Sequence, residues 1–366
     1  MDKFKGSTDA ASATRAVASG VRSAAPGSVV VEVPVADGGD GTVDAAVSAG
    51  FERAFFESIG PLGSRARSSL ALSGRRAVVE VANSSGMQLV PAGAVDPLGA
   101  HSYGVGLGVR AALQRGATEI VIGLGGSASS DGGAGMLTAL GVGLLDARGD
   151  RISLGVEGLL SLCDVDLTGL DPRLAGAQII LGGDVDNPLL GEHGAARVFA
   201  AQKGADVSDI AVIERALARF AEVTTRCLGE SFESAAGAGA AGGIGFAGLA
   251  FLGGQMDSGA RIVLDLVGLR DQLTHADLVV TGEGQLDQQS ERGKAPVAVA
   301  RAARYAGVQC VAVVGRRRLD LPRVARVGFA AAYELIAIEP DGRKCMSGAE
   351  GLLEVVGRQI VADGWV

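Results

Sequence analysis

One stretch, residues 120–141, constrains the fold of this chain more than any other. It opens with an apolar run, Ile-Val-Ile-Gly-Leu, continues through a loop of glycine and serine, and returns to a helical apolar pattern at Met136. A buried strand, a glycine-rich loop and a helix start in this order present backbone N–H groups to an anionic oxygen. Asp131, inside the loop, adds a carboxylate that suits a metal ion or a hydroxyl group. The alternative is a tight strand-to-helix turn in which glycine only supplies positive φ.

Four further loops of the same character favour the binding interpretation. Each combines glycine with acidic side chains or lysines, and they span residues 2–6, 34–42, 182–191 and 282–294. In α/β proteins, loops of this kind follow the carboxyl ends of strands and line one crevice. The sequence therefore predicts an α/β fold with a ligand site built from these five loops.

Two of these loops hold more carboxyl-type groups than a turn or a helix cap requires. Asp37 and Asp40 precede a predicted helix, where one N-cap aspartate would suffice. Asp184, Asp186 and Asn187 follow a predicted strand together. Hard cations take oxygen ligands, so we expect the first pair to contact magnesium or a cationic substrate.

Hydrophobic periodicity and turn residues predict the remaining elements. Helices are expected over residues 10–24, 43–49, 102–112, 210–228, 295–306 and 352–362, and a further close-packed helix, entered by a glycine loop, within the glycine–alanine stretch 237–254. Strands are expected over residues 29–33, 65–71, 75–81, 120–124, 179–181, 277–281 and 311–314. No strand precedes the loop at residues 2–6, although such a loop normally follows one. We expect either a start codon placed too late or a protein that lacks this first strand.

Composition excludes several classes of protein. The formal net charge of −8 argues against nucleic-acid binding. No apolar run reaches the roughly 18–20 residues of a membrane helix. The N-terminus has no signal-peptide pattern, so a cytoplasmic protein is expected. The four cysteines and three histidines are scattered, which disfavours zinc patterns, disulfides and Cys- or His-based catalysis.

The polar side chains of the loops fit phosphoryl transfer. Magnesium needs oxygen ligands, phosphate oxygens need N–H groups and ammonium groups, and the attacking hydroxyl needs a carboxylate base. The phosphate-loop motif of many nucleotide-binding enzymes is absent, because Ala295 follows Lys294 and no glycine stands at the matching upstream position.

The motifs and their order resemble those of bacterial type I glycerate kinases along essentially the whole chain. They are DKFKG at 2–6, PVADGGDGT at 34–42, GLGGSASSDGGAG at 123–135, DVDNPLLG at 184–191, GAAGG at 239–243, TGEGQLD at 281–287 and RGKAP at 292–296. The resemblance implies ATP-dependent phosphorylation of D-glycerate with Mg²⁺, mostly giving 2-phosphoglycerate. It also implies two interlinked α/β domains with the active site in the cleft between them. A flavodoxin-like domain would comprise residues 1–62 and 275–366, and an inserted α/β domain residues 63–274.

Residue roles are assigned within this resemblance. The candidates for the general base are Asp184, Asp186 and Asp287, of which Asp184 and Asp186 are also the candidate metal ligands. The cations expected to neutralise phosphate or the substrate carboxylate are Lys3, Lys5 and Lys294. The groups expected to hold phosphate or substrate oxygens are Gly125, Gly126, Ser127 and Ser129, with Asp131 nearby. Further polar contacts are expected from Asp2, Asp37, Asp40, Asn187 and Glu283.

Two other functions stay open at this point. A kinase for another small sugar acid or polyol would use the same groups. A non-catalytic sugar-acid sensor would use the lysines and N–H groups, but it would not need five aspartates together in the loops. Both glycerate hydroxyls stay open as phosphoryl acceptors.

Overall fold

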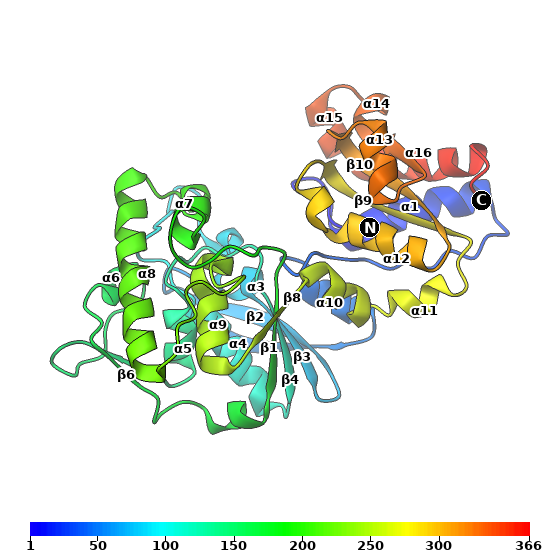
Figure 1. The fold of residues 1–366 in the computed structure, drawn as a ribbon. Coiled ribbons are helices and arrows are strands. Elements are labelled where there is room, and N and C mark those ends of the chain that lie inside the picture. Colours follow the sequence, from blue (N-terminus) through cyan, green and yellow to red (C-terminus); the bar gives the residue numbers. More distant parts are fainter. The chain divides into compact units, whose positions relative to one another are not determined.

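The computed structural model describes residues 1–366, apart from the side chain of Arg292, and divides into two compact units (Figure 1). The first unit comprises residues 1–37, 44–49 and 260–366, and the second comprises residues 38–43 and 50–259. Both are α/β, which confirms the predicted fold class. The predicted domain boundaries, after residues 62 and 274, lie further along the chain than these.

The sheet of the first unit is parallel and has helices on both faces (Figure 1). Its strand order is β11-β10-β9. Val311 and Val313 belong to one apolar cluster with helices α1 and α16, whereas Ala312 and Val314 belong to another with α12. This alternation is the two-residue period of a strand buried on both faces. The elements are α1 (Ala10–Ala24), β9 (Leu278–Leu286), α12 (Ala295–Tyr305), β10 (Gln309–Arg317), β11 (Ala331–Glu334) and α16 (Ala349–Ala362).

The predicted strand over residues 29–33 is wrong. The segment belongs to no strand, and the hydrogen bonds near it join it to Met1: the Met1 amine donates to Val33 O at 3.4 Å and Val35 N donates to Met1 O at 3.0 Å. A strand needs a row of partners along its neighbour, and one residue cannot supply it. Val29 is accordingly 92% exposed.

The sheet of the second unit is mixed. Its order is β1-β2-β3-β4-β7-β8. The pairs β1–β2 and β2–β3 are antiparallel, and the pairs β3–β4, β4–β7 and β7–β8 are parallel. Its strands are β1 (Glu52–Ile59), β2 (Arg65–Ser73), β3 (Arg76–Glu80), β4 (Glu119–Gly123), β7 (Gln178–Gly182) and β8 (Gln255–Asp257). A separate two-stranded sheet contains β5 (Gly143–Leu145) and β6 (Asp164–Asp166).

Several helices pack with this sheet in one apolar core. Four of them are α4 (Tyr103–Gln114), α5 (Ala134–Ala139), α8 (Val207–Leu228) and α9 (Ile244–Leu252). Phe220 of α8 lies edge-on to Phe246 of α9 at 5.4 Å between ring centroids, an arrangement that aromatic pairs prefer. Helix α8 begins three residues earlier than predicted because Asp206 and Asp209 form a capping box there.

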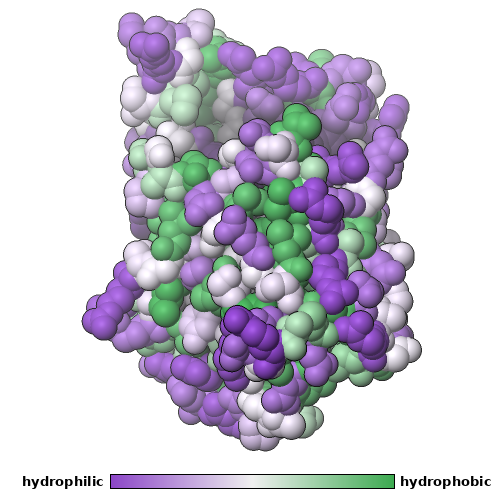
Figure 2. Space-filling model, turned by 90° about the vertical axis from the view of Figure 1, so that its left-hand side faces the viewer, coloured by the Kyte–Doolittle hydropathy of each residue, from purple (hydrophilic) through white to green (hydrophobic). Residues whose placement is uncertain are grey.

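The chain forms nine further α-helices in the described residues. They are α2 (Thr42–Ser48), α3 (Val81–Ser85), α6 (Val156–Leu159), α7 (Ala195–Phe199), α10 (Gly259–Leu266), α11 (Leu269–Leu273), α13 (Leu321–Val327), α14 (Leu335–Ile338) and α15 (Gly342–Ser347). Across the described residues, no helix combines the length and the apolar character needed to cross a membrane. On the face drawn in Figure 2, strips of apolar residues are interrupted by hydrophilic ones.

Candidate functional site

The central loop lies where the parallel strands of the second unit end. Glu80, Gly123 and Gly182 are register partners at the carboxyl ends of β3, β4 and β7. Beyond them, Leu124 N donates to Gly182 O at 2.9 Å, so the loops that follow β4 and β7 start side by side. The carboxyl edge of a parallel sheet is where α/β proteins bind their ligands.

The glycines of this loop allow close contact with residues 38–43. A Cβ atom at Gly123 would lie 2.6 Å from Gly38 O, and one at Gly125 would lie 2.5 Å from the Cα of Gly39. Glu80 fixes the same segment by accepting hydrogen bonds from Gly41 N at 3.2 Å and Val43 N at 3.0 Å. Close backbone approach, rather than ligand binding alone, therefore explains why glycine stands at these positions.

Asp131 is an internal anchor of the loop. Its fully buried carboxylate accepts hydrogen bonds from Ser102 N and Oγ at 2.9 Å each, from Gly133 N at 3.2 Å and from Gly135 N at 3.0 Å. A carboxylate has about four acceptor sites. The protein itself uses the oxygens that the sequence analysis assigned to a ligand.

Lys203 contacts the predicted site residues but was not among them. Its buried Nζ donates to Ser127 Oγ at 2.9 Å and to Ser129 O at 2.5 Å. Burial lowers the pKa of Lys203 to about 8, against the opposing effect of the Asp131 carboxylate. The sequence signal for Lys203 is weak: a single lysine in an alanine-rich segment between two helices.

The loop after β7 carries the candidate metal ligands. Asp184 Oδ1 accepts hydrogen bonds from Ser258 Oγ and Gly259 N, both at 3.0 Å, and Asp186 is exposed. Asn187 Nδ2 donates to His193 O at 2.7 Å, which orders the loop itself. The described residues contain no group of three or more His, Cys, Asp or Glu side chains able to hold an ion. Magnesium usually takes one or two protein carboxylates together with substrate phosphates and water, so Asp184 and Asp186 fit that mode.

A second set of predicted residues lies in the first unit, beside the second half of β9. Asp2 N donates to Gly282 O at 2.9 Å, which places Asp2 beside Glu283. Burial and the nearby Asp37 raise the pKa of Asp2 to about 6. Burial raises the pKa of Glu283 to about 7, although Ser290 and Lys294 act in the opposite direction.

Asp287 caps the loop that follows β9. It accepts hydrogen bonds from Gln285 Nε2 and Gln289 N at 2.9 Å each and from Ser290 N at 3.3 Å. Burial works to raise the pKa of Asp287, but these hydrogen bonds prevail and the pKa is lowered. Lys294 Nζ, at the start of α12, donates to Gln289 Oε1 at 3.4 Å.

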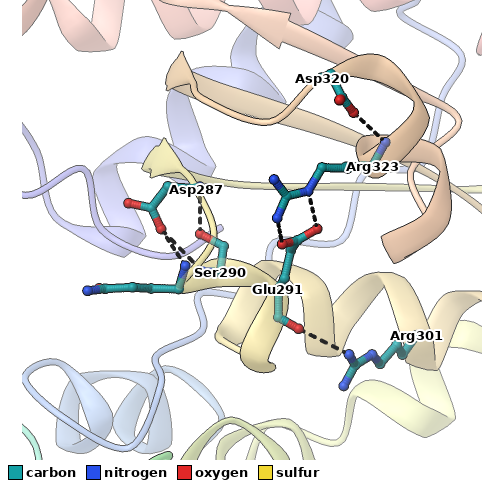
Figure 3. Close-up of polar contacts among 7 residues, drawn as sticks. Asp287, Ser290, Glu291, Arg301, Asp320 and Arg323 are labelled. Atoms are coloured by element: carbon teal, nitrogen blue, oxygen red, sulfur yellow. Dashed lines mark hydrogen bonds and ion pairs between the residues drawn. The ribbon is translucent and has the colours of Figure 1, made fainter.

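An ion pair between Glu291 and Arg323 joins the same loop to helix α13 (Figure 3). Glu291 pairs with both Arg323 Nε and Nη2, and Arg301 Nη2 donates to Glu291 O at 3.3 Å. Asp320 caps helix α13 by accepting from Arg323 N at 2.9 Å. The loop that carries Asp287 is therefore tied to helices α12 and α13.

The remaining predicted residues are more open. Lys5 is exposed, and its backbone N lies 3.4 Å from where a Cβ atom at Gly284 would be, next to β9. Lys3 is half-buried. Asp37 and Asp40, expected to act together, belong to the first and second unit respectively. The predicted cleft between two domains stays a prediction.

Strand-end loops with carboxylates, lysines and glycine N–H groups on α/β units are typical of enzymes that transfer phosphoryl groups. Comparison with known proteins identifies the kind of phosphoryl-transfer enzyme that this chain resembles. The model of the Glycerate kinase family matches residues 1–363. Glycerate 2-kinase of Escherichia coli K12 is 42% identical over 92% of this chain and 89% of its own length. Glycerate kinase of Bacillus subtilis 168 is 39% identical over 99% of this chain and 96% of its own length.

A solved structure agrees with these relatives. A protein of Salmonella typhimurium LT2, described as glycerate kinase 2, superimposes with a TM-score of 0.84 at 38% identity and covers 99% of this chain and 96% of its own. The chain belongs to the glycerate kinase family, and the prediction of a kinase is confirmed.

Proposed function

We propose that this protein transfers the γ-phosphoryl group of ATP to D-glycerate, giving 2-phosphoglycerate, in the presence of Mg²⁺. The observation that carries the proposal is the nearly full-length identity of 42% with a protein named Glycerate 2-kinase. The lysines, carboxylates and loop N–H groups of the described site supply the chemistry that such a transfer requires.

The residues of each unit have distinct tasks in this proposal. Asp184 and Asp186 would hold the magnesium ion, which when bound neutralises charge on phosphate oxygens. Lys294, Lys3 and Lys5 would neutralise phosphate or the glycerate carboxylate. The loop after β4 would bind oxygens through its backbone N–H groups and the Ser127 hydroxyl, which can still donate while it accepts from Lys203.

The decisive experiment measures turnover and the position of the phosphate in one sample. ADP release would be followed with ATP, Mg²⁺ and D-glycerate, and the product examined by proton-coupled ³¹P NMR. A phosphate on the secondary hydroxyl has one proton on the attached carbon and gives a doublet, whereas a phosphate on the primary hydroxyl gives a triplet. We expect the doublet.

Other outcomes would favour the alternatives. A triplet would keep the kinase and change the acceptor hydroxyl. Faster turnover of another small sugar acid or polyol would replace D-glycerate as the substrate. Binding of D-glycerate without ADP release, by folded protein, would favour a sugar-acid sensor.

A further inference from the structure

We propose that Glu283, paired with Asp2, is the base that accepts the proton of the substrate hydroxyl. The inference rests on the proposed function and names the group that carries out its proton transfer. Neither residue was a candidate for the base in the sequence analysis, which left Asp184, Asp186 and Asp287 open for that role.

The position of Glu283 is that of a functional group. It lies within β9 (Leu278–Leu286), three residues before that strand ends, and is the register partner of Val314 in β10. Its side chain is buried, and the residue is only 6% exposed. In the part of the chain that the structure describes, its Oε1 atom has no hydrogen-bond partner. A buried oxygen without a partner is unfavourable, so Oε1 is the atom of Glu283 that can take a hydrogen bond from a bound substrate.

Asp2 is the second member of the pair. Its backbone N–H donates to Gly282 O at 2.9 Å, and its carboxylate accepts from Lys3 N at 2.7 Å. The residue is also 6% exposed. Burial raises the pKa of Glu283 most, and the neighbouring Asp2 carboxylate raises it further, because a like charge disfavours ionisation.

The surrounding charges do not remove this effect. Asp37 and the Met1 amine act on Asp2 with opposite signs, and Lys3 favours its ionised form. Asp287 and Lys294 likewise oppose each other at Glu283. The net result is a pKa of about 6 for Asp2 and about 7 for Glu283. A base whose pKa lies near the working pH combines availability with proton affinity.

The earlier candidates are poorer bases. Asp287 uses its oxygens to cap its own loop, and its hydrogen bonds lower its pKa. Asp184 accepts hydrogen bonds from Ser258 and Gly259. The hydrogen bonds to Asp287 stabilise its ionised form and leave it with less affinity for a proton than Glu283, whose Oε1 atom has no partner among the described residues.

In the proposed step, phosphoryl transfer and proton transfer take place at the same substrate hydroxyl. The substrate hydroxyl oxygen forms a bond to the γ-phosphorus of ATP while the bond from that phosphorus to the bridging oxygen breaks. ADP leaves with the electron pair of the broken bond. The hydroxyl proton passes to Glu283 Oε1 and is later released to solvent, which restores the carboxylate.

The first test compares Glu283→Gln and Asp2→Asn with the unaltered protein. Glu283→Gln should lower kcat by roughly 10²–10⁴-fold, the usual contribution of a general base, and leave the KM for ATP nearly unchanged. The acid limb of the wild-type kcat/KM profile should have its midpoint near the pKa of Glu283, about 7. Asp2→Asn should move that limb to lower pH, because a like charge beside Glu283 is lost. Glu350→Gln, an exposed glutamate of the same unit, is the matched control.

A second readout does not depend on activity. Folding raises the pKa of Glu283 from its ordinary value of 4.5 to about 7, so the folded state binds more protons in this range. Stability must therefore fall as pH rises through the window, and Glu283→Gln removes that fall. The urea midpoint of Glu283→Gln relative to wild type should be higher at pH 8 than at pH 5. Glu350→Gln should show no such trend.

The outcomes separate the two levels of the proposal. If the wild type does not phosphorylate D-glycerate at any pH, the proposed function fails and this inference fails with it. If the wild type is active and folded Glu283→Gln has a similar kcat, only the inference is overturned. An acid limb that does not move in Asp2→Asn would also overturn the pairing.

Discussion

Lys203 shows how one buried side chain orders a functional loop. Its Nζ holds Ser127 Oγ and Ser129 O, and a Cβ atom at Gly242 would lie 2.9 Å from that Nζ. We expect Lys203→Met to lower the free energy of unfolding by about 1–3 kcal/mol, because two buried acceptors lose their donor. Urea unfolding at pH 7 measures this change. Lys344→Met, at an exposed lysine, should change it by less than about 0.5 kcal/mol.

The same lysine gives a pH dependence with a definite sign. Folding lowers the pKa of Lys203 from 10.5 to about 8, so between these values the unfolded chain binds more protons. The contribution of Lys203 to stability must rise with pH across this window. The difference in unfolding free energy between wild type and Lys203→Met should therefore widen from pH 8 to pH 10. A constant difference would show that the ammonium group is not buried as described.

Asp131 allows a test of a structural role against a role in ligand binding. Asp131→Asn turns an acceptor into a partial donor that faces the N–H groups of Gly133 and Gly135. We expect a loss of about 2–3 kcal/mol in unfolding free energy without any ligand. Asp150→Asn, at an exposed aspartate of the same unit, is the control. A variant of normal stability with a raised KM would instead make Asp131 a ligand contact.

At the scale of elements, helices α1 and α16 pack closely against each other because each has a glycine at the contact, Gly20 in α1 and Gly357 in α16. A Cβ atom at Gly20 would lie 2.1 Å from Glu354 O, and one at Gly357 would lie 2.4 Å from Val17 O. Gly20→Ala must push the helices apart, and we expect it to lower the free energy of unfolding by about 1–3 kcal/mol. Thermal or urea unfolding measures the effect.

Gly351→Ala is the matched control for this crossing. Gly351 lies in α16 with no atom within 4 Å of an added Cβ. The same substitution should stabilise the protein there by about 0.5–1 kcal/mol, because alanine favours the helix. Opposite signs for the two variants would assign the effect to the crossing. Equal effects would contradict the close packing.

Capping residues, turn residues and hydrophobic periodicity predicted most elements, because nearby residues determine where a helix begins and ends. The helix over residues 10–24 was predicted with both ends, since Asp9 caps its first turn and Pro26 follows it. The strand over residues 29–33 failed for the opposite reason, because a strand depends on a neighbour that its own sequence does not encode.

The candidate site likewise has features that local sequence predicts and features that depend on contacts between distant segments. Loops at strand ends could be located from the sequence, which is how Asp184 and Asp287 were singled out, whereas Glu283, expected in a loop, lies inside β9 because that strand runs to Leu286. Hydrogen bonds between distant segments could not be found. Asp131 binds Ser102, which is 29 residues away, and Lys203 binds Ser127, which is 76 residues away. The free oxygen of Glu283 likewise emerges only from the packed structure.

At the scale of the whole molecule, a ligand that binds the folded state must raise the free energy of unfolding. A ligand that binds only the folded state at 100 times its Kd adds about 2.7 kcal/mol to the free energy of unfolding. D-glycerate and a non-hydrolysable ATP analogue with Mg²⁺ should therefore each raise the melting temperature of a kinase. A sugar-acid sensor would respond to D-glycerate alone.

Magnesium removal extends this argument to the metal ligands. If Asp184 and Asp186 hold an ion that contacts phosphate oxygens, EDTA should remove most of the stabilisation by the nucleotide and little of that by D-glycerate. Asp186→Asn, at an exposed carboxylate, should weaken nucleotide stabilisation in the same way without EDTA, whereas Asp150→Asn should not. Because the readout is unfolding of the whole chain, it needs no turnover. Equal stabilisation by the nucleotide with and without EDTA would remove both aspartates from the metal site.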